Sequence, residues 1–168
     1  VEAWRERVAL LTGDDGALFT FLVSSKQTMT ADPDVEGDLE RVRSVLARAD
    51  AVVWSTGSRL ADCLALTPAA IHRVAPHLTV TTISPFGLEG PWSDRAATEF
   101  TLQAWSGGII GLGRGAPDRA PVFVGGQIGE WLTGTQAAIG TIASRARAQQ
   151  AGPGELVDVS MLETLALG

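Results

Sequence analysis

The segment from Ile83 to Gly108, ISPFGLEGPWSDRAATEFTLQAWSGG, decides how the rest of the chain is interpreted. It begins as the end of a strand, and Pro85 and Gly87 break that strand into a loop. From about Ala96 the pattern is helical, as far as the pair of glycines that ends it. Glu99 lies in the first turn of this predicted helix, directly after a loop rich in small residues. A carboxylate in that position is a candidate nucleophile.

Outward from this segment, predicted strands and helices alternate along the chain. Apolar or alternating runs predict strands at residues 17–23, 51–54, 78–83 and 155–160. Helical spacing predicts helices at residues 1–11, 39–49, 59–66, 69–75 and 127–150, and another from 161. Asp38 and Thr67 are the expected N-caps of two of them. This order predicts an α/β fold with a parallel sheet and crossover helices, with the opening loop at the carboxyl end of a strand, where such sheets bind ligands.

The composition excludes several classes of protein. With 45% hydrophobic and 19% charged residues, the 168-residue chain has the composition of a folded globular domain. A net charge of −6 argues against a nucleic-acid partner, and no apolar run approaches the roughly 18–20 residues of a membrane span. The single cysteine, Cys63, cannot form an internal disulfide, so we expect a small core residue in a cytoplasmic protein. Because the chain starts at Val1 rather than at a methionine, we interpret it as a piece of a longer protein.

The candidate residues each have an ordinary structural interpretation beside a functional one. Glu99 is as well placed to cap its helix as to act as a nucleophile. Gly87 either makes a turn or lets a substrate approach the backbone closely. Lys26, the only lysine in the chain, is most simply a solvated surface residue. His72 and His77 lack the spacing of metal ligands, so no metal site is predicted.

Three segments resemble the class III CoA-transferase family, which includes formyl-CoA transferases, carnitine CoA-transferases, bile-acid-inducible proteins and α-methylacyl-CoA racemases. The segments are SPFGLEGPWSDRAATEFTLQAWSG (84–107), VGGQIGEWLTGTQAAIGTIA (124–143) and GPGELVDVSMLE (152–163). The resemblance implies a Rossmann-like large domain that meets a smaller one, in an interlocked homodimer. It assigns residues 1–110 to the CoA-binding large domain, 111–126 to a connection, and 127–168 to a long helix and a strand-helix unit leading towards the small domain.

The resemblance also implies a role for Glu99. Family enzymes carry an aspartate in a segment of the form R-P-x-x-D, followed by a helix that ends in Ser-Gly. The matching residues here are 95–99 and 106–107, with glutamate in place of aspartate. In the transferases this carboxylate attacks an acyl-CoA, passes through a mixed anhydride and an enzyme-bound CoA thioester, and so moves CoA to an acceptor acid. The implied substrates are an acyl-CoA and a carboxylic acid, with no permanently bound cofactor.

The resemblance further places CoA contacts at Lys26, Ser55, Thr56 and Ser84, and close approach of the thioester at Gly87. The family has additional cations and an aromatic residue in these regions, which this chain lacks, so weaker CoA binding is expected. Two alternatives to a transferase therefore stay open. One is an acyl-CoA racemase of the same family, and the other is a catalytically degenerate family domain with a structural role.

Overall fold

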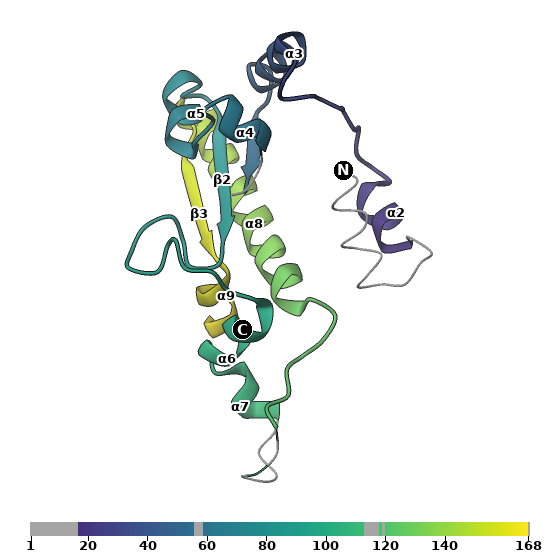
Figure 1. Ribbon diagram of the computed structural model, residues 1–168. Coiled ribbons are helices and arrows are strands. Elements are labelled where there is room, and N and C mark those ends of the chain that lie inside the picture. The colour runs from purple at the N-terminus through teal and green to yellow at the C-terminus, as the bar shows by residue number, and fades with distance from the viewer. Residues whose placement is uncertain (1–16, 56–58, 113–117, 119, 168) are drawn as a thin grey trace. The chain divides into compact units, whose positions relative to one another are not determined.

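The computed structural model describes residues 17–55, 59–112, 118 and 120–167 (Figure 1). The predicted helix at residues 1–11 lies outside these ranges. The chain divides into two compact units, residues 1–31 and 32–168, and each is described by itself. The domain boundaries implied by the family resemblance stay a prediction.

The described part of the first unit contains helix α2 (Ala17–Val23), where the sequence predicted a buried strand. That prediction is wrong, and Phe21 within the segment is 70% exposed. An uninterrupted apolar run of this length does not distinguish a strand from a helix. A helix forms its backbone hydrogen bonds within its own segment, whereas a strand requires a partner strand, and this segment is a helix.

The second unit is built on a three-stranded parallel sheet with the order β1-β2-β3. The strands are β1 (Ala51–Trp54), β2 (Thr79–Ser84) and β3 (Leu156–Ser160). The helices are α3 (Glu36–Leu46), α4 (Arg59–Cys63), α5 (Pro68–Val74), α6 (Glu99–Trp105), α7 (Gly108–Leu112), α8 (Ile128–Ala151) and α9 (Met161–Leu167). The α/β fold with a parallel sheet is therefore confirmed. Among the described residues, no helix combines the length and the apolar character needed to cross a membrane.

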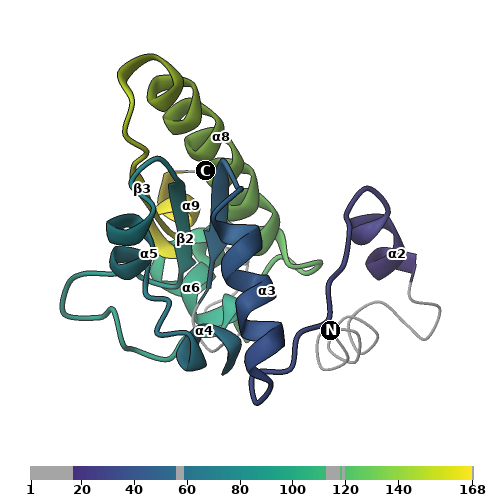
Figure 2. The same ribbon diagram turned by 90° about the horizontal axis from the view of Figure 1, so that it is seen from above.

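The side chains of β2 alternate between two covered faces of the sheet. On one face, the hydroxyl of Thr81 lies 2.6 Å from the hydroxyl of Thr141 in α8. On the other face, Val80 is fully buried and forms a core cluster with Ile71 of α5. Figure 2 shows α8 and α5 on opposite sides of the strands. The sheet is thus the middle layer of the second unit, as period-two alternation requires of a buried strand.

Two of the predicted helix starts can be compared with the structure. Thr67 is the N-cap of α5, as predicted, and its hydroxyl accepts a hydrogen bond of 3.1 Å from the N–H of Ala70. Asp38 is not the N-cap of α3, because the helix begins two residues earlier. Instead its carboxylate accepts a hydrogen bond of 2.9 Å from the N–H of Asp32, which lowers the pKa of Asp38. Asp38 therefore fastens the incoming loop to the first turn of α3.

The turn before β2 packs tightly against the residue that precedes β3. Gly154 donates a hydrogen bond of 2.7 Å from its N–H to the carbonyl of Pro76, and the ring of His72 lies 2.9 Å from the carbonyl of Gly154. A Cβ at Gly154 would lie 2.3 Å from the carbonyl oxygen of Leu78. Two backbone segments meet here at a distance that only glycine permits.

Candidate functional site

The loop that follows β2, residues 85–98, starts at the carboxyl edge of the sheet. Ser84 ends β2, is 7% exposed, and accepts a hydrogen bond of 2.8 Å from the N–H of Gly87. Gly87 has a φ of +89°, a conformation that favours glycine. Beside this turn is a hollow of about 320 Å³, lined by Phe86, Gly87, Leu88, Glu89, Leu156, Asp158, Ser160 and Glu163. Gly87 therefore makes the turn that the sequence predicted and also lines a hollow at the carboxyl edge of the sheet.

Asp158 fixes the loop to the sheet, and the sequence analysis did not single it out. Its Oδ1 accepts a hydrogen bond of 2.7 Å from the hydroxyl of Thr82, its partner across the strand pair. Its Oδ2 accepts one of 2.8 Å from the N–H of Leu88 in the loop. An acidic residue in an apolar strand, within a segment that resembles the family, was the available signal. Asp158 therefore shapes the floor of the hollow.

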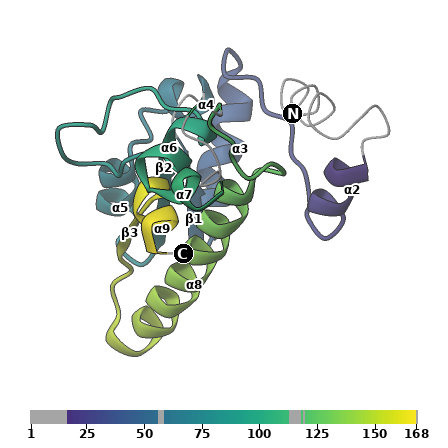
Figure 3. The same ribbon diagram turned by 90° about the horizontal axis from the view of Figure 1, so that it is seen from below.

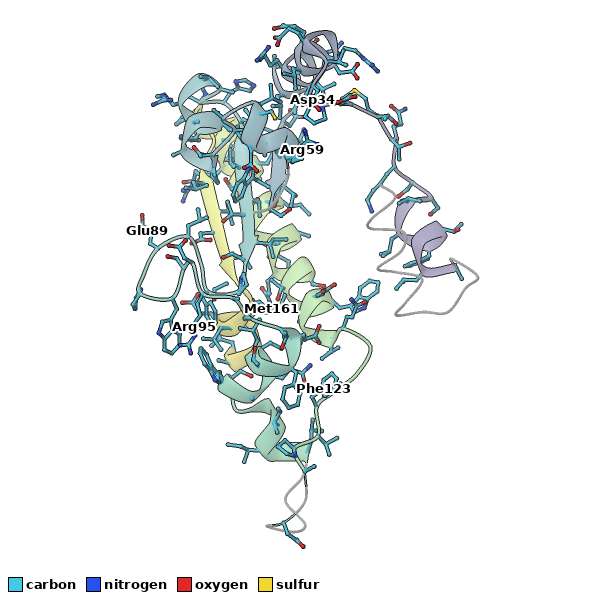
Figure 4. The ribbon with its side chains drawn as sticks, in the orientation of Figure 1. Asp34, Arg59, Glu89, Arg95, Phe123 and Met161 are labelled. Atoms are coloured by element: carbon cyan, nitrogen blue, oxygen red, sulfur yellow. The ribbon has the colours of Figure 1, made fainter. Side chains whose placement is uncertain are left out.

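Aromatic rings gather around Arg95 at the end of the same loop. The guanidinium of Arg95 lies 4.4 Å from the ring centre of Trp105 and 5.7 Å from that of Trp92, within the range of cation–π attraction. The two tryptophan rings are 4.8 Å apart, and Phe86 lies 5.6 Å from Trp105. Figure 4 shows Arg95 and Glu89 on this one loop. Since Trp105 is the last residue of α6, the cluster joins the loop to the carboxyl end of this helix.

Glu99 is the first residue of α6, which confirms the predicted position in the first turn. The predicted start near Ala96 is three residues too early, because Thr98 is the N-cap and forms a capping box with Thr101. The side chain of Glu99 instead points at another helix. Its Oε1 accepts a hydrogen bond of 3.0 Å from the N–H of Gly129, in the first turn of α8. Glu99 therefore does cap a helix, but the helix is α8 rather than α6, which Glu99 itself begins.

Gln103 provides a second donor to the same oxygen. Its Nε2 donates hydrogen bonds of 2.9 Å to Oε1 of Glu99 and 2.9 Å to the carbonyl of Val124, and its Oε1 accepts one of 2.9 Å from the N–H of Val124. Gln103 is 2% exposed. By contrast, Oε2 of Glu99 is buried and has no hydrogen-bond partner among the described residues. The two oxygens of one carboxylate therefore have different surroundings.

Gly129 allows this close contact between α6 and α8. A Cβ at this position would lie 3.4 Å from Cγ and Cδ of Glu99 and 3.3 Å from Leu165 of α9. The N-cap of α8, Gln127, makes no capping hydrogen bond with its own side chain, which leaves that function to Glu99. Figure 3 shows α6 and α9 alongside α8, in agreement with the contacts between these helices. A carboxylate near the amino end of a 24-residue helix also benefits from the helix dipole.

The other predicted site residues that the structure describes belong to different elements of the chain. Lys26 belongs to the first unit, where its ammonium group donates to the carbonyl of Leu22. Ser55 is exposed at the carboxyl end of β1, and Thr56 lies outside the described residues. Ser84 lies at the carboxyl end of β2, and Glu99 is not among the residues that line the hollow beside Gly87.

Arg59, which directly follows residues 56–58 in the chain, forms an ion pair with Asp34. Arg59, the first residue of α4, places Nη2 3.1 Å from both carboxylate oxygens of Asp34. Figure 4 shows the two side chains facing each other. Both are largely exposed, so the pair contributes little to stability. The described residues contain no group of His, Cys, Asp and Glu that could hold a metal ion.

Comparison with known proteins identifies the chain. The family model for CoA-transferase family III matches residues 2–167. The chain belongs to CoA-transferase family III. Over 147 residues it is 30% identical to the formyl-CoA:oxalate CoA-transferase of Streptomyces avermitilis, and over 142 residues it is 29% identical to the succinyl-CoA–D-citramalate CoA-transferase of Chloroflexus aurantiacus. These alignments cover 88% and 84% of this chain but 35% of each relative.

A solved structure supports the same assignment. The CAIB/BAIF family protein from Brucella suis is 28% identical and superposes with a TM-score of 0.73, over 84% of this chain and 37% of that one. The family III chain described here thus spans 35% to 37% of the length of these relatives. Family membership and the parallel sheet agree with what the three sequence segments implied.

Proposed function

We propose that this family III chain is part of an enzyme that transfers CoA from an acyl-CoA to a carboxylic acid, with Glu99 as the nucleophile. The observation that carries the proposal is the environment of the Glu99 carboxylate. It lies at the amino end of α8, with two hydrogen-bond donors on Oε1 and none among the described residues on Oε2. The names of the relatives, which act on formyl-CoA and succinyl-CoA, support the class of reaction.

The proposed reaction has four steps. Oε2 attacks the thioester carbonyl carbon, the carbon–sulfur bond breaks, and CoA leaves as the thiolate, which gives a mixed anhydride. The thiolate then attacks Cδ of Glu99, and the acyl group departs as a free carboxylate, which leaves a glutamyl-CoA thioester. In the third step the acceptor carboxylate attacks Cδ of this thioester and the CoA thiolate leaves, which gives a second mixed anhydride. In the fourth step the thiolate attacks the acyl carbon of the acceptor, so that the new acyl-CoA forms and Glu99 leaves as the free carboxylate. Each step forms one bond and breaks one, and no cofactor is consumed.

We also propose the CoA contacts and assembly that the family resemblance implies. Ser55, Thr56, Ser84, Gly87 and Lys26 contact CoA, and the full-length protein is an interlocked homodimer. Exposed apolar side chains of α8, Ile139 at 56% and Ile142 at 69%, support a covered surface in the assembled protein. Light scattering of the full-length protein tests the dimer. A monomeric mass at micromolar concentration would contradict it.

One observation favours a second candidate function, that of a degenerate domain with a structural role. Oε2 of Glu99 is buried, so an acyl-CoA cannot reach it until the surrounding side chains move. Oε1 already caps α8, a function that requires no chemistry. The two candidates differ in one respect that can be measured, which is whether a covalent adduct forms on Glu99.

A trapping experiment separates the two. The full-length protein is incubated with formyl-CoA or succinyl-CoA, without acceptor acid, and then treated with hydroxylamine. For a transferase we expect a hydroxamate at Glu99, located by peptide mass spectrometry, and none in a Glu99→Gln variant. No adduct with either donor, together with no detectable CoA binding, contradicts the transferase and supports the degenerate domain. Exchange of the α-proton of succinyl-CoA for deuterium without an adduct would indicate a racemase.

A further inference from the structure

We infer that the N–H of Gly129 and the side-chain amide of Gln103 form an oxyanion hole for the carboxyl carbon of Glu99 itself. In the second proposed step this carbon, Cδ, becomes tetrahedral and Oε1 takes a full negative charge. The two donors lie 3.0 and 2.9 Å from Oε1, within the roughly 2.7–3.1 Å expected of such groups. This inference rests on the proposed function and assigns Gln103 as a residue that contacts the reacting group.

The orientation of the Gln103 amide is determined by Val124. Its oxygen accepts from the N–H of Val124, and its nitrogen donates to the carbonyl of Val124. Rotating the amide by half a turn would place oxygen against oxygen and nitrogen against N–H, with both bonds lost. The second hydrogen of Nε2 is therefore directed at Glu99. Since Gln103 is 2% exposed, this donor acts in a region with little competing water.

The position of the Gly129 donor is equally restricted. Its N–H lies in the first turn of α8, where backbone donors have no partner within the helix. A Cβ at this residue would lie 3.4 Å from Cδ of Glu99 and 3.3 Å from Leu165, so a larger residue would have to displace the Glu99 carboxyl slightly. The loop from Gly125 to Gln127 and the pairing of Val124 with Gln103 hold the start of α8 against α6.

The asymmetry of the carboxylate assigns a role to each oxygen. Oε2 has no donor among the described residues, so no hydrogen bond to it has to be broken when it attacks the acyl-CoA. Oε1 stays on Cδ through the whole cycle. When the CoA thiolate attacks Cδ of the anhydride, a carbon–sulfur bond forms and the carbonyl electron pair moves to Oε1. When that pair returns, the bond from Cδ to Oε2 breaks, and the acyl group leaves as a carboxylate. The hydrogen bonds to Oε1 are therefore strongest when Cδ is tetrahedral and Oε1 carries the negative charge.

The test compares Gln103→Met with Gln136→Met in the full-length protein. Met has nearly the length of Gln but no amide donor, and Gln136 is an exposed residue of α8. Formation of the glutamyl-CoA thioester from succinyl-CoA is followed in single turnovers by mass spectrometry. The amount formed is divided by the concentration of active sites, which is determined by titration. We expect Gln103→Met to slow this step by about 10²- to 10³-fold, with KM for succinyl-CoA changed by less than about threefold. Gln136→Met should match the wild type.

Gln103→Met also removes the partner of Val124, so a loss of folded protein must be distinguished from a loss of the donor. The carbonyl stretch of the trapped thioester does this, with ¹³C-labelled glutamate to identify it. Two hydrogen bonds lower the frequency of a carbonyl stretch, and loss of one raises it. We expect a higher frequency in Gln103→Met and, from the slightly displaced carboxyl, in Gly129→Ala. A purely structural role would reduce the yield of folded protein but leave both rate and frequency of the folded fraction unchanged.

These measurements distinguish failure of the oxyanion hole from failure of the proposed function. If the wild type forms the thioester and Gln103→Met forms it at the same rate with the same carbonyl frequency, the oxyanion hole is overturned and the proposed function stands. If the wild type forms no adduct on Glu99, the proposed function fails and this inference fails with it. A slower step with a higher frequency in Gln103→Met supports both.

Discussion

The carboxylate of Glu99, at the first residue of α6, accepts a hydrogen bond of 3.0 Å from the N–H of Gly129 in the first turn of α8. The contact joins two helices through one side chain and one backbone group. It gives Glu99 a structural function whether or not the residue also performs chemistry. Substitutions that preserve one function and remove the other therefore separate the two.

Glu99→Gln should abolish CoA transfer while it preserves the fold. Its amide oxygen can still accept from Gly129 and Gln103, but an amide is not a competent nucleophile. Because the neutral amide gives up the favourable interaction with the dipole of α8, Glu99→Gln is expected to cost about 0.3–1 kcal/mol. Glu99→Ala leaves two donors without an acceptor and should cost about 1–3 kcal/mol. Thermal unfolding of the full-length variants measures the difference, and equal melting temperatures would show that the cap is unimportant.

Glu99→Asp should be less active than the wild type, although aspartate is the residue expected from the family pattern. The shorter side chain retracts the carboxylate by roughly 1–1.5 Å, which moves it out of hydrogen-bond distance of Gly129 and Gln103. Misplacement of that size costs on the order of 10²-fold in rate. The measurement is kcat/KM with succinyl-CoA and a panel of acceptor acids. A gain in activity would mean that the longer side chain is not matched to this site.

Local sequence patterns were sufficient to predict much of the secondary structure. Apolar and alternating runs predicted the strands that become β1, β2 and β3, and Thr67 before Pro68 predicted the start of α5. These signals are local, because the spacing of apolar residues and the capping of a helix each depend on residues that are close in the chain. The segment Ala17–Val23 failed for the same reason, since apolar content without a period does not select strand over helix.

The candidate site depended on contacts between distant residues, which pattern does not reveal. Glu99 and Gly129 are 30 positions apart, and Leu88 and Asp158 are 70 apart. The sequence could indicate that Glu99 was a carboxylate at a helix start. It could not indicate that the carboxylate faces a second helix, because that depends on the absence of a side chain at Gly129 and on how α6 and α8 pack.

Gly154→Ala should be strongly destabilising, whereas Gly134→Ala should stabilise. A Cβ at Gly154 would lie 2.3 Å from the backbone oxygen of Leu78, and backbone cannot rotate away as a side chain does. Overpacking of this kind costs about 1–3 kcal/mol or more. Gly134 lies inside α8 with open space around its Cβ position, so alanine should gain about 0.5–1 kcal/mol from helix propensity. Denaturant unfolding of the two variants should give changes of opposite sign, and a tolerated Gly154→Ala would contradict the tight contact between β3 and the turn before β2.

Asp158→Ala should release the loop that borders the hollow without unfolding the sheet. The substitution removes the acceptors of the Thr82 hydroxyl and the Leu88 N–H, and an alanine fits the strand without a new contact. We expect faster hydrogen exchange at the amide of Leu88, whose bond is lost, and unchanged exchange at that of Gly87, which donates to Ser84. The expected loss of stability is about 1–2 kcal/mol. Asp158→Asn retains one acceptor and serves as the matched control. If exchange at Leu88 were the same in the wild type and in Asp158→Ala, the carboxylate would not be what holds the loop.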